Sequence, residues 1–110
     1  MRMTLLWTYE GEMRSLIDYD TVTGMVSVEN STRARSPVEL AFGTRTRVGP
    51  ADVEALIKSR CLEDTRVDKK LWIQKLGCES DAPLDFIKVT EGRMAQDRFG
   101  LKLVRMEMEP

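Results

Sequence analysis

The sequence predicts an α+β fold of two layers, in which an antiparallel sheet of about five strands packs against two or three consecutive helices. Larger apolar side chains alternate along the first part of the chain, which is the period of a half-buried strand. In the middle part they recur every three or four residues, which is the period of a helix. A final run rich in β-compatible residues predicts that the chain then returns to the sheet.

The chain has 110 residues, of which 42% are hydrophobic and 32% charged, and its formal net charge is −1. These values are typical of one globular domain and exclude the collagen-like and disordered classes. We therefore expect a single domain over 1–110, with mainly a β meander in 1–43, a helical segment in 49–92 and the final strand in 99–108. No apolar run approaches the roughly 18 residues of a membrane span, so no membrane partner is expected.

Four strands are expected in the first part, over residues 3–9, 13–19, 25–29 and 38–42. In the first of them Met3, Leu5 and Trp7 alternate with smaller or polar residues, which is typical of a strand with one buried face. The fourth is short, has apolar residues at alternate positions and ends at Gly43, so we expect it at an edge of the sheet.

Two helices are expected next, over 51–60 and from Asp64 or Thr65 to Leu76. Pro50 suits the first turn of the first helix, and Gly77 suits the left-handed residue that ends the second. The second helix carries an apolar stripe, which predicts a buried face; the stripe consists of Val67, Leu71, Ile73 and Leu76.

Residues 82–91 permit either a helix or a strand, because Leu84 and Phe86 alternate while Pro83 and Gly92 punctuate the segment like a helix. We favour a short third helix. The final strand at 99–108 ends in Met106 and Met108, which alternate with charged residues. An exposed last strand can pair with another chain, so we expect a monomer or an edge-paired homodimer.

Several reaction classes are excluded because the chain contains no histidine, and with it no imidazole base or imidazole metal ligand. Its two cysteines, Cys61 and Cys78, form no CxxC motif, and we expect free thiols rather than a disulfide. The N-terminal segment lacks the apolar core of a secretory signal, so the chain is expected to be cytoplasmic. No catalytic motif, metal site or cofactor is expected, and we predict that the protein is not an enzyme.

The one marked charge asymmetry is a basic stretch at 33–47, which holds four arginines against the single Glu39. Arg33 and Arg35 precede the expected fourth strand, and Arg45 and Arg47 follow it. A spacing of two in extended chain places each pair on one side, where guanidinium groups can bind carboxylates or phosphates. The alternative is that arginines at a sheet edge only prevent aggregation.

The C-terminal half resembles short uncharacterised open reading frames of bacterial mobile elements and prophages, chiefly of Firmicutes type. The resemblance covers about residues 53–104 and rests on Arg60-Cys61, Thr65-Arg66-x-Asp68, Leu76-Gly77, Pro83-Leu84-x-x-Ile87, Thr90-x-Gly92-Arg93-Met94 and Asp97-x-Phe99. The chain departs from that pattern at Arg98-Phe99-Gly100, where such proteins often carry an aromatic pair. The resemblance implies a small accessory protein of a phage or plasmid.

Together these patterns lead us to expect a non-enzymatic interaction protein that binds a host protein or ribonucleoprotein through Arg33, Arg35, Arg45 and Arg47. An anti-CRISPR or another anti-defence inhibitor would be one instance. The alternative is a nucleic-acid-binding regulator that uses the same arginines.

Overall fold

The computed structural model describes residues 1–61, 67–80 and 82–107. Its elements follow one another as β1 (Arg2–Tyr9), β2 (Glu12–Asp20), β3 (Val26–Asn30), the 3-10 helix η1 (Pro37–Glu39), α1 (Pro50–Ser59), α2 (Lys69–Leu76), α3 (Pro83–Thr90) and β4 (Phe99–Glu107). The predicted α+β class is confirmed. The sheet has four strands, where about five were expected.

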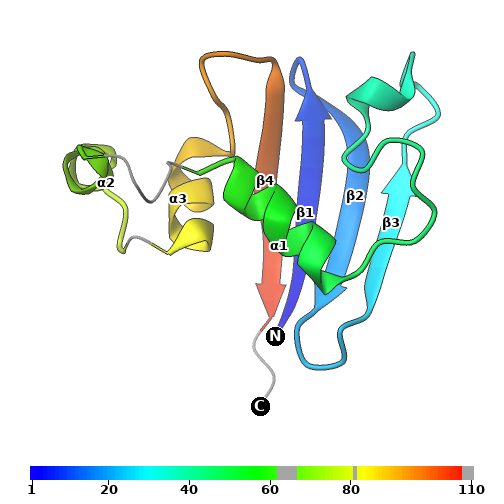
Figure 1. Ribbon diagram of the computed structural model, residues 1–110, viewed down its shortest axis with the longest axis horizontal. Helices are drawn as coiled ribbons and strands as arrows, with labels where there is room; N and C mark the ends of the chain where they lie inside the picture. The colour runs from blue at the N-terminus through cyan, green and yellow to red at the C-terminus, as the bar shows by residue number, and fades with distance from the viewer. Residues whose placement is uncertain (62–66, 81, 108–110) are drawn as a thin grey trace.

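The sheet is antiparallel throughout, and its strands lie in the order β3-β2-β1-β4 (Figure 1). The predicted meander of the first three strands is confirmed, and the last strand returns to pair with the first. Leu5 of β1 stands opposite Ile17 of β2 on one side and Leu103 of β4 on the other. The strand β1 is therefore interior to the sheet, and β3 and β4 form its two edges.

The core lies between one face of the sheet and the helices α1 and α3 (Figure 1). Leu5, Ile17 and Leu101 of the sheet are fully buried, and so are Val53 of α1 and Ile87 of α3. Burial of each such side chain contributes about 1.5–3 kcal/mol, so this layer contact supplies much of the driving force for folding.

The helix α1 begins as its sequence predicts. Pro50 occupies its first turn, and the Asp52 carboxylate accepts a hydrogen bond of 2.9 Å from the backbone N–H of Gly49. This contact satisfies one of the N–H groups that a helix start leaves unpaired. The segment over 82–91 is also a helix, α3, as favoured above, and the chain leaves it through Glu91 and Gly92, both with positive φ.

The helix α2 differs from its prediction in what it buries. Gly77 does end it in the left-handed conformation, but none of its residues is buried, and Leu71 is 51% exposed. The expected start at Asp64 or Thr65 lies outside the described residues. The predicted buried stripe is wrong because α2 lies beyond α3 and not on the sheet (Figure 1).

The predicted fourth strand over 38–42 is wrong, because the chain forms the turn η1 there. The Ser36 hydroxyl accepts a hydrogen bond from the Val38 N–H, and the Leu40 N–H donates to the Pro37 carbonyl. Burial is also the reverse of the predicted alternation, since Glu39 is buried and Val38 is 79% exposed. The arginine pairs consequently flank a turn, and β3 forms this edge of the sheet.

Candidate functional site

The four predicted arginines lie on the long connection between β3 and α1, residues 31–49, which we call the arginine loop. Contacts from the sheet hold the middle of this loop in place. The indole Nε1 of Trp7 donates a buried hydrogen bond of 3.1 Å to the Glu39 carbonyl. The Ala41 N–H donates to the Ser15 hydroxyl, also over 3.1 Å. The loop backbone is therefore fixed on the sheet although it adds no strand to it.

A buried ion pair connects the arginine loop to β2. Arg14 Nε donates to Glu39 Oε1 over 2.8 Å, and both side chains are about nine-tenths buried. The other carboxylate oxygen of Glu39 accepts from the Arg35 backbone N–H, also over 2.8 Å. The Arg14 hydrogen bond holds the pKa of Glu39 below its usual range, and the same bond raises the pKa of Arg14. The pair thus stays charged at neutral pH, and it fixes the backbone that precedes η1.

All four predicted arginines are exposed, and the structure places them in different surroundings. Arg45 pairs with Asp52 in the first turn of α1 at 2.6 Å. Arg35 lines a hollow of about 300 Å³ beside Tyr9 and Glu12 of the β1–β2 hairpin. Arg35 and Arg45 therefore do not belong to one cluster, because Arg35 lies beside the hairpin and Arg45 is paired with the start of α1.

Three of these side chains have no ionic partner in the part of the chain that the structure describes, namely Arg33, Arg35 and Arg47. Their guanidinium groups are therefore available to an external anion. Arginine presents its N–H donors in a rigid planar fork, which matches carboxylate and phosphate groups.

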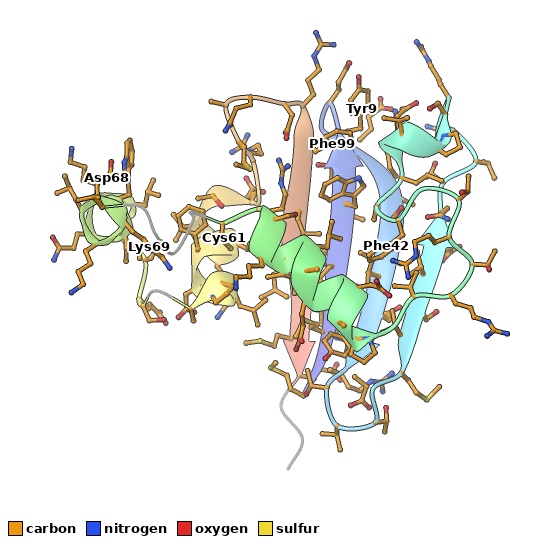
Figure 2. All side chains as sticks on the ribbon, viewed as in Figure 1. Tyr9, Phe42, Cys61, Asp68, Lys69 and Phe99 are labelled. Atoms are coloured by element: carbon orange, nitrogen blue, oxygen red, sulfur yellow. The ribbon has the colours of Figure 1, made fainter. Side chains whose placement is uncertain are left out.

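Two arginines that the sequence analysis did not select have structural roles. Arg60 lies over the Trp7 ring at 5.4 Å, and Arg14 lies over the Tyr9 ring at 6.0 Å. Between them Phe99 stacks on Trp7 with ring centroids 5.0 Å apart and contacts Tyr9 at 5.1 Å (Figure 2). The result is one ladder of cations and aromatic rings across the end of the sheet. No local sequence pattern indicates it, because its members come from four separate segments.

The cysteines offer little support for nucleophilic chemistry. Neither forms a disulfide within the described residues, in agreement with the prediction. Cys61 Sγ donates to the Ile57 carbonyl over 3.3 Å, as a thiol at a helix end commonly does. Burial, and secondly the charge of Asp85, raise the pKa of the Cys78 thiol, which disfavours the reactive thiolate.

Among the described residues no group of three cysteine, aspartate or glutamate side chains is placed to hold a metal ion. In the same residues no helix has the length and apolar character needed to cross a membrane. Comparison of the chain with protein-family models, with curated proteins and with solved structures gives no match.

Two arginine–carboxylate pairs predict how stability depends on pH, the buried pair Arg14–Glu39 and the pair of Arg60 with the partly exposed Asp97. The pKa values of Glu39 and Asp97 are both lowered, in each case chiefly by a hydrogen bond from an arginine. A carboxyl group with a lowered pKa in the folded state stabilises the protein above its unfolded-state pKa, and this contribution disappears as pH falls through the folded-state pKa. We expect the thermal midpoint to change little from pH 7 to about pH 5 and to fall steeply below about pH 4.

The variant Glu39→Gln is the control for this prediction, with thermal unfolding followed by circular dichroism at each pH. It should be less stable than wild type at pH 7, and it should lose less stability on acidification, because one of the titrating groups is gone. Equal losses in the two proteins would show that the Arg14–Glu39 pair contributes nothing to the pH dependence.

Proposed function

We propose that this chain is a non-enzymatic interaction domain that binds an acidic surface of a partner protein through the arginine loop. The observation that carries the proposal is the combination of a fixed backbone with exposed, unneutralised guanidinium groups on Arg33, Arg35 and Arg47. A loop that is already ordered loses less conformational entropy on binding than a mobile one, which favours affinity. The exposed Val38 lies between the two arginine pairs and adds an apolar contact.

Carboxylates are the favoured partners because the aromatic ring beside Arg35, that of Tyr9, already contacts Phe99 and Arg14. The aromatic side chains of the sheet, Trp7, Tyr9, Tyr19 and Phe99, belong to or border the covered core. Proteins that bind single-stranded nucleic acid usually add exposed aromatic side chains to a basic groove. Guanidinium groups also bind phosphate, so a nucleic-acid-binding regulator is the alternative that the experiment must distinguish.

The biological setting follows from the sequence resemblance and is part of the same proposal. A small accessory protein of a bacterial mobile element or phage, acting in the cytoplasm, would bind a host protein or ribonucleoprotein. An anti-CRISPR or other anti-defence inhibitor is one form of such a protein. A compact domain of this size suits this role, because inhibition by binding needs only a surface.

The experiment is an affinity capture from bacterial lysate, with and without nuclease, in which three immobilised proteins are compared. They are the wild type, the variant with Arg33, Arg35, Arg45 and Arg47 replaced by alanine, and a control of equal charge change with Lys58, Lys75, Arg93 and Arg98 replaced by alanine. A specific protein that survives nuclease treatment is then purified and its affinity measured for all three.

We expect the loop variant to lose at least about tenfold in affinity and the control to stay within about threefold of wild type. If nuclease abolishes capture, the protein is instead a nucleic-acid-binding regulator. Its affinity for nucleic acid should then fall steeply with added salt. If the loop variant folds normally and keeps every partner, the proposal is wrong and the arginines only keep the surface soluble.

A further inference from the structure

One face of the sheet is left uncovered by the helices, and we call it the open face. It can be followed row by row across the four strands, because residues paired opposite each other share a face. In one row Glu29 of β3, Leu16 of β2, Leu6 of β1 and Lys102 of β4 stand side by side. The two leucines are half-buried although no helix of the described residues covers them, and the two ends of the row carry opposite charges.

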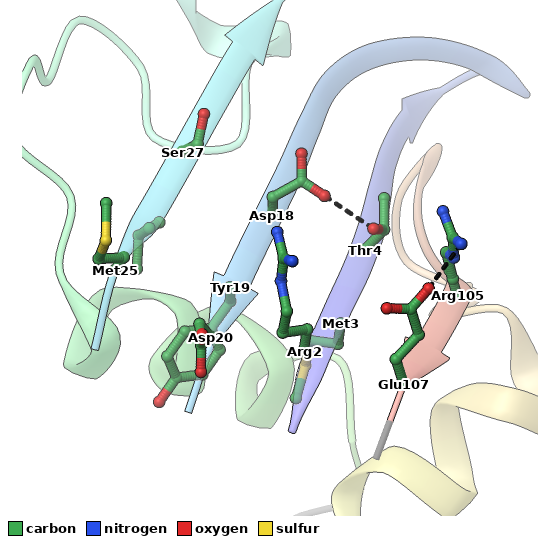
Figure 3. A pocket seen from close by; sticks show the side chains of 11 residues that line it. Arg2, Met3, Thr4, Asp18, Tyr19, Asp20, Met25, Ser27, Arg105 and Glu107 are labelled. Atoms are coloured by element: carbon green, nitrogen blue, oxygen red, sulfur yellow. Dashed lines mark hydrogen bonds and ion pairs between the residues drawn. The ribbon is translucent and has the colours of Figure 1, made fainter. Parts of the chain in front are cut away.

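The next row repeats this division of charge, and the row after it does so in β2 and β1 but has the acidic Glu107 in β4 (Figure 3). Asp18 and Asp20 belong to β2, whereas Arg2 belongs to β1 and Arg105 to β4. The β2–β3 half of the open face is therefore acidic and the β1–β4 half is basic. Between these side chains lies a shallow hollow of about 400 Å³, lined mainly by polar groups.

Some of these charges already have partners within the chain. Thr4 donates to Asp18 over 2.7 Å, and Glu107, an acidic residue on the basic half, lies 2.5 Å from Arg105. Lys102 lies 3.2 Å from Glu91, but about half of its side chain remains exposed. Exposed pairs of this kind exchange partners at little cost, so they do not prevent an intermolecular contact.

We propose that two copies of this chain pack open face against open face in a symmetric dimer. A twofold axis that runs between the sheets along the strand direction places β3 of one copy over β4 of the other. Glu29 then faces Lys102 of the second copy, Leu16 faces Leu6, and Asp20 faces Arg2. A twofold interface must be self-complementary, and the charge division across this face meets that requirement.

The size of the open face limits the strength of this dimer. Four strands at about 4.8 Å spacing and about eight residues at 3.4 Å rise give a face of roughly 19 by 27 Å. Two such faces bury on the order of 1,000 Å², which is below the roughly 1,200–2,000 Å² of stable specific interfaces and within the range of weak, transient ones. The dimer is therefore weak, and salt weakens it further because charge pairs surround a small apolar centre.

This inference is independent of the proposed function, because the arginine loop contributes no residue to these rows. The proposed dimer also differs from one in which two β4 edges pair. In that edge-paired dimer Glu29 makes no contact with the second copy, because it lies on β3 at the opposite edge of the sheet. The distinguishing feature is the Glu29–Lys102 contact. Within one chain these residues are separated by two strands, about 14 Å, so they can pair only between copies.

The test is sedimentation velocity of the purified protein at about 5 to 500 µM, a range that brackets the affinity of small interfaces. Wild type, Glu29→Lys, Lys102→Glu and the double exchange are compared at low and high salt. We expect wild type to dimerise, each single reversal to weaken the dimer at least about tenfold, and the double exchange to return within about threefold of wild type. Thermal unfolding confirms that each variant folds.

Several outcomes would overturn the proposal. A protein that stays monomeric at the highest concentration in low salt has no such dimer. A dimer that is unaffected by Glu29→Lys uses another surface, such as the β4 edge. Loss of the dimer in both single variants without recovery in the double exchange would mean that Glu29 and Lys102 do not face each other.

Discussion

Replacing Arg60 by methionine is expected to lower the free energy of unfolding by about 3 kcal/mol, because it removes a buried guanidinium group that is paired with the partly exposed Asp97. Arg60 follows α1 and is 5% exposed. Its guanidinium donates two hydrogen bonds of 2.8 Å to Asp97 and further ones to the carbonyls of Gly92 and Phe99, at 2.7 and 3.1 Å. Methionine fills a similar volume but removes all four hydrogen bonds, and Asp97 Oδ1 keeps only the one that it accepts from the Phe99 N–H over 3.0 Å.

Urea-induced unfolding measures this effect, and Arg93→Met is the matched control. Arg93 lies between α3 and β4, in the connection that also holds Gly92 and Asp97. Its ion pair with Glu91 is exposed, so loss of this pair should leave stability nearly unchanged. Equal stabilities for the two variants would show that the Arg60 contacts contribute no more than a surface ion pair. Adding Asp97→Asn to Arg60→Met should cost little more, because the two residues act through one contact.

Gly92→Ala should destabilise the protein by a similar amount, about 3 kcal/mol, for a reason of backbone geometry. Gly92 has a φ of +65°, which residues with a Cβ atom rarely adopt. An added Cβ would also lie 2.5 Å from the backbone nitrogen of Leu101. The Leu101 N–H donates to the Glu91 carbonyl over 2.9 Å, so the turn and β4 cannot separate without loss of this bond.

Gly77→Ala separates the two contributions, again by urea-induced unfolding. Gly77 has a φ of +75°, but no atom lies within 4 Å of the position of an added Cβ. Its substitution should cost only the backbone strain, about 1 kcal/mol. If both variants lost the same stability, the close approach of Gly92 to β4 would have no energetic consequence.

Much of the fold is predictable because the strands and helices have strong local patterns. Met3, Leu5 and Trp7 alternate and do face the core, and the punctuation by Pro83 and Gly92 correctly favours a helix over a strand. These signals are local, since each depends on residues a few positions apart. The packing of α2 is not local: its apolar stripe has helical spacing, but nothing in the stripe shows that the helix lies beyond α3.

The candidate site is less predictable, because it depends on contacts between distant segments. Val38, Leu40 and Phe42 alternate like a strand, yet the buried residue of that stretch is Glu39, whose carboxylate reaches Arg14. Arg14 itself turns inward because the register of β1 against β2 shifts after Trp7. A carboxylate paired across the fold in this way has the same local sequence as a solvated one. The sequence therefore identifies the basic loop but not how it is held.

The position of β1 has a consequence for how the chain reaches its native state. Its hydrogen bonds to β2 form within a hairpin, whereas those to β4 join residues near opposite ends of the sequence. During synthesis on the ribosome β1 and β2 emerge early, and the β1 edge stays open until β4 follows the three helices. Long-range pairing of this kind slows folding and leaves an unpaired strand exposed to aggregation in the meantime. The nascent chain thus has an interval in which a chaperone, or the early docking of α1 over Leu5 and Ile17, is most valuable.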